Sequence, residues 1–148
     1  MPRPKSNKIV HSPPLFTDFK PVGQRGPSLE QIELSLDEFE AFRLAYQLNL
    51  SHAEAAEEMG ISRSTFSRLI DQARGKIADF IIKGKFLTIN GGKIHFRTNT
   101  IQCQSCGHMF KTDFSKTVTE CPACHSTKLL NLAGGFGHGR CCRNSQNS

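Results

Sequence analysis

The spacing of apolar and polar residues predicts three consecutive helices between residues 35 and 84. The first helix begins at Ser35, because the run Ser35-Leu36-Asp37-Glu38 has the form of a capping box. Apolar residues follow at helical steps until the helix ends near Asn49. A second capping box, Ser51-His52-Ala53-Glu54, begins a shorter helix that ends at Gly60. Glycine suits the left-handed position that follows a helix, so a turn is expected there.

The third predicted helix is the longest. It is capped by Ser62 and ends near Gly84. Its apolar residues recur at three- and four-residue steps, and they are Phe66, Leu69, Ile70, Ala73, Ile77, Phe80 and Ile81. This spacing predicts one apolar face, with Phe66 and Leu69 buried.

The segments on either side of the helices have different patterns. Residues 1–28 contain six of the seven prolines, which excludes a regular helix and predicts an irregular arm. After the third helix, the apolar runs Phe86–Ile89 and Lys93–Phe96 flank the turn sequence Asn90-Gly91-Gly92. Asn and Gly tolerate the positive φ of tight turns, so we expect these two runs to form a β-hairpin.

The charge reverses its sign within the helical region. The chain carries a net charge of +6, but residues 29–61 hold one Lys or Arg against eight Asp or Glu. Residues 62–99 hold eight Lys or Arg against two Asp or Glu. The acidic part should therefore face solvent or a basic partner, whereas the basic part can meet phosphates.

A short helix, a glycine turn and a capped second helix form the layout of a DNA-binding helix-turn-helix, whose second helix enters the major groove. Small Ala56 allows the two helices to approach closely. The residues expected to contact bases or phosphates are Arg63, Ser64, Thr65, Ser67, Arg68 and Gln72. The arm residues expected to follow phosphates or the minor groove are Arg3, Lys5 and Lys8. The alternative is an ordinary three-helix bundle with a solvated polar face.

The order of these motifs resembles an uncharacterised prokaryotic family of predicted DNA-binding proteins. The resemblance rests on Met1-Pro-Arg-Pro4, on Phe19-Lys-Pro21, and on the segments Leu34–Ala45 and Leu50–Gly92. It covers roughly residues 1–92, and the helix-turn-helix is similar to region 4 of primary sigma factors. The resemblance implies DNA binding.

Two Cys-x-x-Cys pairs, Cys103-Gln-Ser-Cys106 and Cys121-Pro-Ala-Cys124, predict a structural zinc site of the zinc-ribbon type. A segment of this size has too little core to fold without such a cross-link. Two variants of the site stay open at this point. His108 or His125 could replace one cysteine, and iron, which the same four thiolates would also hold, is the less favoured metal.

The last cysteines lie in a different context. Four glycines between Gly134 and Gly139 exclude a stable helix or strand and predict a flexible tail that carries His138, Cys141 and Cys142. These three residues could complete a second metal site, sense oxidation, or remain exposed without a role. His52 and His95 are lone histidines, which are more often surface or hydrogen-bonded residues than metal ligands.

Together these patterns predict a mainly α N-terminal helix-turn-helix domain of three helices with an irregular N-terminal arm, followed by a small β zinc-ribbon domain. The expected divisions are a basic Pro-rich arm (1–28), a DNA-binding domain with a C-terminal hairpin (29–99), a zinc ribbon (100–132) and a flexible Gly/Cys tail (133–148).

Several classes of protein are disfavoured by what the sequence lacks. No phosphate-binding Gly-rich loop, nucleophile elbow, HExxH motif or carboxylate cluster outside the acidic helices is present, so we do not expect an enzyme. No apolar run approaches the roughly 20 residues of a membrane-spanning helix, and the N-terminus lacks the features of a secretion signal. A cytoplasmic protein is expected.

The leading hypothesis is a sequence-specific regulator of transcription that binds double-stranded DNA and holds zinc. The second hypothesis is an adaptor that docks on RNA polymerase or another protein through its acidic helices and zinc ribbon. A third is a metal- or redox-responsive regulator that depends on Cys141 and Cys142. The oligomeric state stays open, with a homodimer on two half-sites as one option.

Overall fold

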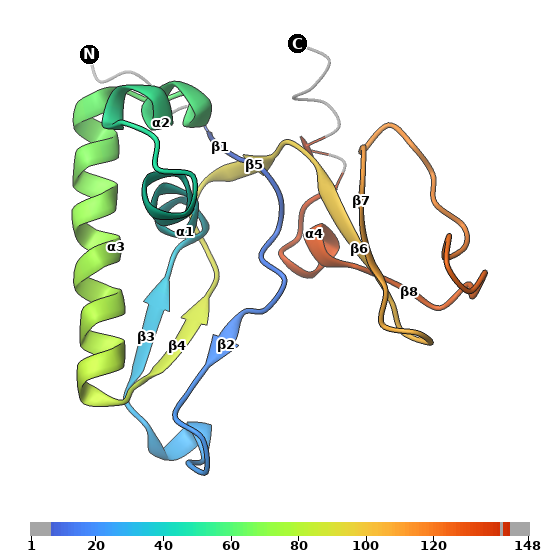
Figure 1. The fold of residues 1–148 in the computed structure, drawn as a ribbon, viewed down its shortest axis with the longest axis horizontal. Helices are drawn as coiled ribbons and strands as arrows, with labels where there is room; N and C mark the ends of the chain where they lie inside the picture. Colours follow the sequence, from blue (N-terminus) through green and yellow to red (C-terminus); the bar gives the residue numbers. More distant parts are fainter. Residues whose placement is uncertain (1–6, 140, 143–148) are drawn as a thin grey trace. The chain divides into compact units, whose positions relative to one another are not determined.

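The computed structural model describes residues 7–139, 141 and 142, and these residues form two compact units (Figure 1). The first unit contains the described residues up to Ile9 and the segment Phe16–Ile94. The second contains Val10–Leu15 and the described residues from His95 onward. The chain thus enters the second unit briefly, returns to the first, and finishes in the second.

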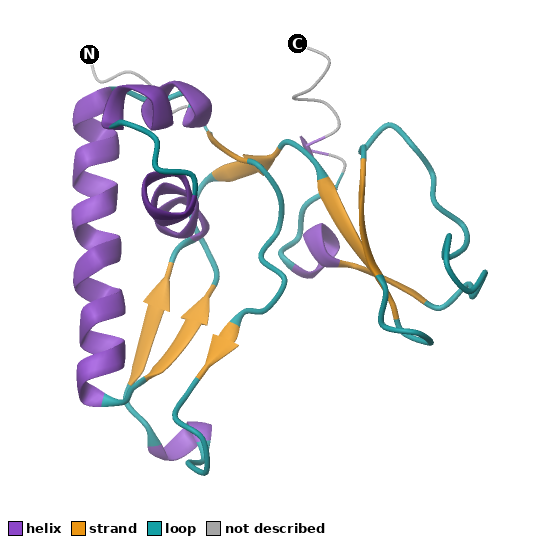
Figure 2. Ribbon diagram, viewed as in Figure 1, coloured by secondary structure: helices purple, strands orange, loops and turns teal. Residues whose placement is uncertain are grey.

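Helices make up most of the first unit, and their limits follow the capping residues of the sequence (Figure 2). They are α1 (Leu36–Phe42), its π-helical continuation η2 (Arg43–Gln47), α2 (His52–Met59) and α3 (Arg63–Lys83). Both predicted capping boxes are present, and Ser62 caps α3. Gly60 and Gly84 adopt the left-handed conformation, with φ of 68° and 63°. The three predicted helices are therefore confirmed, with a π turn in the second half of the first.

A three-stranded sheet completes the first unit, which is mixed α/β rather than mainly α. Its strands are β2 (Asp18–Phe19), β3 (Gln31–Leu34) and β4 (Phe86–Ile89), in the order β2-β4-β3. Strand β4 is central: it runs parallel to β3, with Ile32 opposite Leu87, and antiparallel to β2. Figure 1 shows α3 running beside β3.

The predicted hairpin between residues 86–89 and 93–96 is wrong. Strand β4 pairs with β3 and β2, whereas β5 (Ile94–Phe96) pairs with β1 (Lys8–Val10). The intervening Gly91 has φ of 84°, and its carbonyl accepts the Leu36 N–H at 3.0 Å. A Cβ at Gly91 would lie 2.8 Å from Glu33 Oε1. The two glycines therefore let the chain pass close to the start of α1 instead of closing a two-strand turn.

The N-terminal segment is also more regular than expected. Besides β1 and β2 it contains a short 3-10 helix, η1 (Gly26–Ser28). Its described residues form no α-helix, and the described prolines lie outside the strands: Pro13 and Pro14 stand between β1 and β2, Pro21 follows β2, and Pro27 lies in η1. The arm therefore supplies strands to the fold.

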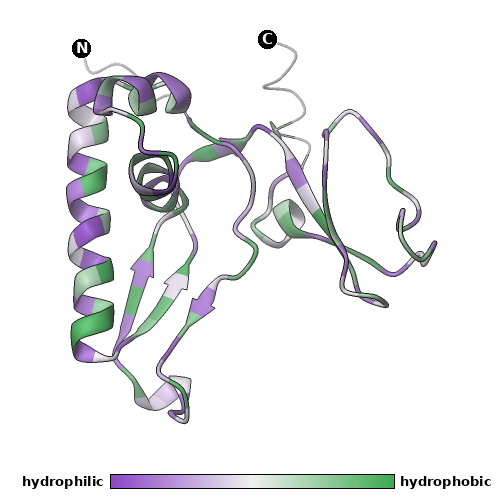
Figure 3. Ribbon diagram, in the orientation of Figure 1, coloured by the Kyte–Doolittle hydropathy of each residue, from purple (hydrophilic) through white to green (hydrophobic). Residues whose placement is uncertain are grey.

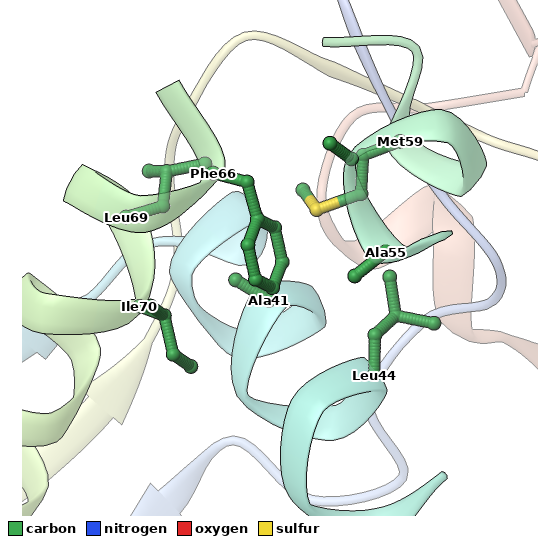
Figure 4. Close-up of a cluster of buried hydrophobic side chains, with 8 residues drawn as sticks. Ala41, Leu44, Ala55, Met59, Phe66, Leu69 and Ile70 are labelled. Carbon is green, nitrogen blue, oxygen red and sulfur yellow. The ribbon is translucent and has the colours of Figure 1, made fainter. Parts of the chain in front are cut away.

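The core of the first unit lies between the helices (Figure 4). Phe66 of α3 is fully buried and points toward Ala41 of α1, with Met59 of α2 nearby. The complete cluster is Ala41, Leu44, Ala55, Ala56, Met59, Phe66, Leu69 and Ile70. Hydrophobic and hydrophilic residues alternate along α3 (Figure 3), and the predicted stripe is buried from Phe66 to Ala73. Ile81, however, is 68% exposed, because the core ends before the last turns of α3.

The second unit is built on an antiparallel sheet of three strands. These are β6 (Asn99–Cys103), β7 (Met109–Thr112) and β8 (Leu129–Asn131), in the order β7-β6-β8. A single helical turn, α4 (Leu132–Gly135), follows β8. Asn131 caps this turn by accepting the Gly134 N–H at 2.9 Å. The expectation that the glycines exclude a helix is thus wrong for Leu132–Gly135, because Asn131 caps this turn and Ala133 is buried.

Candidate metal centres and candidate nucleic-acid interface

The sulfur atoms of the two Cys-x-x-Cys pairs come together in the second unit. The Sγ atoms of Cys103 and Cys124 are 3.5 Å apart, and those of Cys106 and Cys121 are 3.7 Å apart. All four sulfurs lie within 4.8 Å of one another. Four sulfurs around one tetrahedral zinc ion, at the usual Zn–S length of about 2.3 Å, are about 3.8 Å apart. The cluster therefore has the dimensions of a four-thiolate metal site.

The two pairs form matching knuckles. The N–H of Gly107 donates to the Cys103 carbonyl, and the N–H of His125 donates to the Cys121 carbonyl, both at 2.9 Å. Gly107 and His125 have positive φ values of 79° and 63°. Backbone N–H groups also approach the first sulfur of each pair, from Cys106 at 3.5 Å and from Ala123 at 3.4 Å. Such donors stabilise thiolates and direct the sulfur lone pairs inward.

The close packing of the thiols moves the pKa values of Cys103 and Cys124 in opposite directions. The backbone N–H of Cys106 is the main cause that lowers the pKa of Cys103 to about 6. At Cys124 a backbone hydrogen bond from Ser126 acts downward, but the neighbouring sulfurs, Cys103 first, and burial raise the pKa to about 12. Four thiolates repel one another, so a cation is needed before the last thiol gives up its proton near neutral pH.

The histidines considered as alternative ligands lie elsewhere. His108 stacks on Phe110, with ring centroids 5.7 Å apart, and His125 places Nδ1 3.4 Å from Glu120. The cluster of potential metal ligands contains neither of them. The structure brings together the set of four cysteines predicted from the spacing.

A second cluster of potential metal ligands lies in the same unit. It contains His95 of β5 together with His138, Cys141 and Cys142, and their donor atoms all lie within 4.8 Å of one another. Sequence reasoning grouped the last three residues but treated His95 as a lone histidine. The pattern Ile94-His95-Phe96 offered a signal, because a polar residue between two buried ones points to the opposite face of a strand.

This second cluster is partly enclosed. Cys142 is fully buried, and its Sγ accepts the backbone N–H of Phe96 at 3.1 Å. Burial raises the pKa of the Cys142 thiol to about 11. Burial, and then the neighbouring His95, lower the pKa of His138. The alternative in which these thiols remain exposed is therefore wrong for Cys142.

The predicted DNA-contacting residues of α3 fall into two groups. Arg63, Ser64, Arg68 and Gln72 are exposed. Thr65 and Ser67 are half-buried and already have partners: Thr65 Oγ1 accepts from Ser62 Oγ at 2.8 Å, and Ser67 Oγ lies 2.9 Å from His52 Nδ1. His52 also packs edge-on against Phe66, with ring centroids 5.2 Å apart. His52 and Ser67 thus join α2 to α3, and the exposed group remains accessible to a ligand.

The charged residues expected to bind DNA also differ among themselves. Arg63 and Arg68 form no ion pair with any residue that the structure describes. Lys8 lies in β1, and its Nζ is 3.4 Å from Asp37 Oδ2, so it is not the free arm residue expected from the sequence. Arg3 and Lys5 lie outside the described residues.

No helix in the described ranges is both long enough and apolar enough to cross a membrane.

The comparisons with known proteins place the chain among proteins without an assigned activity. The model of the family described as "Protein of unknown function DUF134" matches residues 1–97. A UPF0251 protein of Chloroherpeton thalassium is 45% identical to this chain, and the alignment covers 95% of each. A UPF0251 protein of Moorella thermoacetica is 36% identical, with 99% of this chain and 96% of the relative covered.

A UPF0251 protein of Caldicellulosiruptor bescii is likewise 36% identical, over 97% of this chain and 96% of its own length. No solved structure matches the chain. The similarity to these relatives extends beyond the residues that the family model matches and includes the cysteine-containing unit.

Proposed function

This chain belongs to the DUF134 family of proteins of unknown function, and we propose that it is a sequence-specific DNA-binding protein that regulates transcription. Helices α2 and α3, with the turn at Gly60, act as a helix-turn-helix, and α3 enters the major groove. The four-cysteine cluster holds a structural zinc ion.

The observation that carries the proposal is the unpaired basic surface at the N-terminal end of α3. Arg63 and Arg68 are exposed there and lack ion-pair partners among the described residues, whereas Arg74 and Lys83 further along the helix pair with Asp71 and Asp79. An arginine without an acidic partner keeps its planar set of donors for guanine or phosphate.

The packing of α3 supports the same assignment. Phe66 and Leu69 are buried against α1 and α2, so the opposite face of the helix projects outward. The left-handed Gly60 and the cap at Ser62 make a sharp turn between α2 and α3. The first backbone N–H groups of α3 add positive potential at the end where a recognition helix meets DNA.

Zinc fits the four-cysteine cluster through its donor set. Four thiolates in a tetrahedral arrangement are typical ligands of structural zinc, and the sulfur separations of 3.5 and 3.7 Å agree with it. The ion would supply folding energy to a unit whose described residues are built on a sheet of three short strands. The chain's own knuckle N–H groups would orient the thiolates.

The proposal is tested by selecting bound duplexes from a random DNA pool with zinc-loaded protein at physiological salt. Wild type should enrich one motif. Arg63→Ala and Arg68→Ala should each cost about 1 to 3 kcal/mol of binding and relax the preference at one base position. Lys83→Ala is the matched control, because it removes one positive charge at the other end of α3, about 30 Å away.

The controls separate sequence recognition from general attraction to polyanions. If no motif is enriched, or if Lys83→Ala weakens binding as much as Arg68→Ala, the protein binds DNA only through its overall charge and the proposal fails. A palindromic motif would add that the protein binds as a dimer.

One observation favours a second function, an adaptor for a basic protein partner. Glu54 and Glu57 are exposed on α2, away from the buried Ala55 and Ala56. Under this alternative Glu57→Lys abolishes capture of the partner and leaves DNA affinity intact. Under the DNA-binding proposal Arg68→Ala is the sensitive variant.

A further inference from the structure

We propose that His95, His138, Cys141 and Cys142 form a second metal site, which binds a thiophilic divalent cation of the zinc class and fastens the C-terminal segment to β5. The site is separate from the four-cysteine cluster in its residues and in its donor set. It does not depend on the DNA-binding proposal.

The distances between the donor atoms match those around one metal ion. The Sγ atoms of Cys141 and Cys142 are 3.8 Å apart. Cys142 Sγ lies 3.5 Å from His138 Nδ1 and 3.9 Å from His95 Nδ1, and Cys141 Sγ lies 3.1 Å from His138 Nδ1. Tetrahedral zinc with Zn–S of about 2.3 Å and Zn–N of about 2.0 Å separates two sulfurs by about 3.8 Å and a sulfur from a nitrogen by about 3.5 Å. The observed separations scatter around these values.

The surroundings hold the ligands in place by contacts that do not involve a metal. Phe96 donates its N–H to Cys142 Sγ at 3.1 Å, and its ring packs edge-on against His138 at 5.2 Å between centroids. The His138 N–H donates to the Ala133 carbonyl at 3.0 Å, which fixes His138 after the turn of α4. Ala133 N–H in turn donates to Asn99 Oδ1 of β6 at 3.0 Å. The ligands are thus positioned by the backbone of β5, by the Asn99 side chain of β6 and by a capped helical turn.

Charge explains why a divalent cation is the expected occupant. Two thiolates and two neutral imidazoles carry two negative charges, which one divalent cation neutralises. The neutral product suits the position of Cys142, which has no exposed surface. Mixed sulfur and nitrogen ligands in a tetrahedron are typical of zinc. A pair of exposed thiols without a role would not include a buried cysteine such as Cys142, nor would its sulfur accept a backbone N–H such as that of Phe96.

The competing chemistry is oxidation of the adjacent cysteines. A disulfide between Cys141 and Cys142 requires a separation of about 2.05 Å between the sulfurs, which lie 3.8 Å apart. Its formation would remove both thiolates from the cluster. The test must therefore measure the metal content and the oxidation state together.

The experiment uses the full chain, purified under reducing conditions and reconstituted with Co²⁺ and, separately, with Zn²⁺. Wild type should bind two ions per chain. Cys141→Ser, at the partly exposed cysteine, and His95→Asn should each bind one ion and retain the absorption bands of cobalt held by four thiolates. Cys106→Ser should lose those bands and keep the signal of the site with two thiolates. His108→Asn is the matched control and should keep both ions, because this histidine belongs to neither cluster.

Three outcomes would overturn the proposal: one ion per wild-type chain, two ions in Cys141→Ser, or a wild-type chain whose intact mass under non-reducing conditions shows a Cys141–Cys142 disulfide. Because Cys142 is buried, its replacement perturbs the core as well as the site, so the decision rests on Cys141 and His95. Metal content is measured without DNA, so failure of this proposal is distinguishable from failure of the DNA-binding function.

Discussion

Replacing Glu38 by Gln tests how α3 is fixed against α1. One oxygen of Glu38, Oε1, accepts the backbone N–H of Ser35 at 2.9 Å and the Ser35 hydroxyl at 2.9 Å. The same oxygen accepts the ammonium of Lys76, on α3, at 2.6 Å. Glutamine keeps an oxygen acceptor for the capping box, since Glu and Gln both serve at this position. The variant therefore removes mainly the charge that faces Lys76.

The burial of the two partners sets the expected magnitude. The Glu38 side chain is 4% exposed, whereas that of Lys76 is 38% exposed. Breaking a fully buried pair costs about 3 to 5 kcal/mol, and breaking a surface pair costs about 0 to 1 kcal/mol. A pair with one buried member lies between these limits, so Glu38→Gln should lower the free energy of unfolding by about 2 kcal/mol. Lys76→Met should cost more, because it leaves a buried carboxylate without its cation.

The assay is guanidinium unfolding of zinc-loaded protein, followed by the helical circular dichroism signal. In the described residues this signal comes mostly from α1, α2 and α3, so it reports on the first unit. Glu54→Gln is the matched control, because Glu54 forms a capping box of the same kind with Ser51. Unlike Glu38, Glu54 is exposed and has no lysine partner among the described residues. It should change stability much less. Equal losses for the two glutamine variants would refute the role given to the Lys76 pair.

Three further predictions concern the turns and the four-cysteine cluster. Gly60→Ala should cost about 1 to 2 kcal/mol in the same unfolding assay, because φ is 68° while the new Cβ would meet nothing closer than 3.5 Å; an unchanged stability would show that the turn relaxes. Gly107→Ala should lower the zinc affinity of the second unit by about 1 kcal/mol, measured by competition with a chelator, because Gly107 has positive φ. His125→Gly, at the matching position of the second knuckle, should retain the affinity. A larger loss of affinity in His125→Gly than in Gly107→Ala would contradict the knuckle geometry. Zinc affinity should rise from about pH 6 to pH 8, because the pKa of Cys124 is raised to about 12 and zinc must therefore displace a proton from this thiol. The affinity is measured by competition with a chelator at several pH values. An affinity that does not change with pH would refute the displacement of a proton.

Much of the architecture could be predicted from local sequence. Each capping box, at Ser35 and at Ser51, and the left-handed turn at Gly60 depends only on residues within four positions of one another. These features can therefore be predicted from the sequence alone. The Cys-x-x-Cys spacing likewise indicated the four-cysteine cluster, because each knuckle is closed by its own backbone. Both kinds of prediction are confirmed for the described residues.

The remaining features depended on where distant segments meet. Two of these features join residues at least 29 positions apart: the ion pair of Lys8 with Asp37 and the approach of His95 to Cys142. The third is the pairing of β4, whose neighbouring strands no local pattern specifies. Such contacts form only when packing of the core brings the distant segments together, so no short stretch of sequence specifies them. The sequence by itself therefore determined the helices, their caps and the first metal cluster. The tertiary structure decided the strand pairing, which arginines of α3 remain available, and the second cluster.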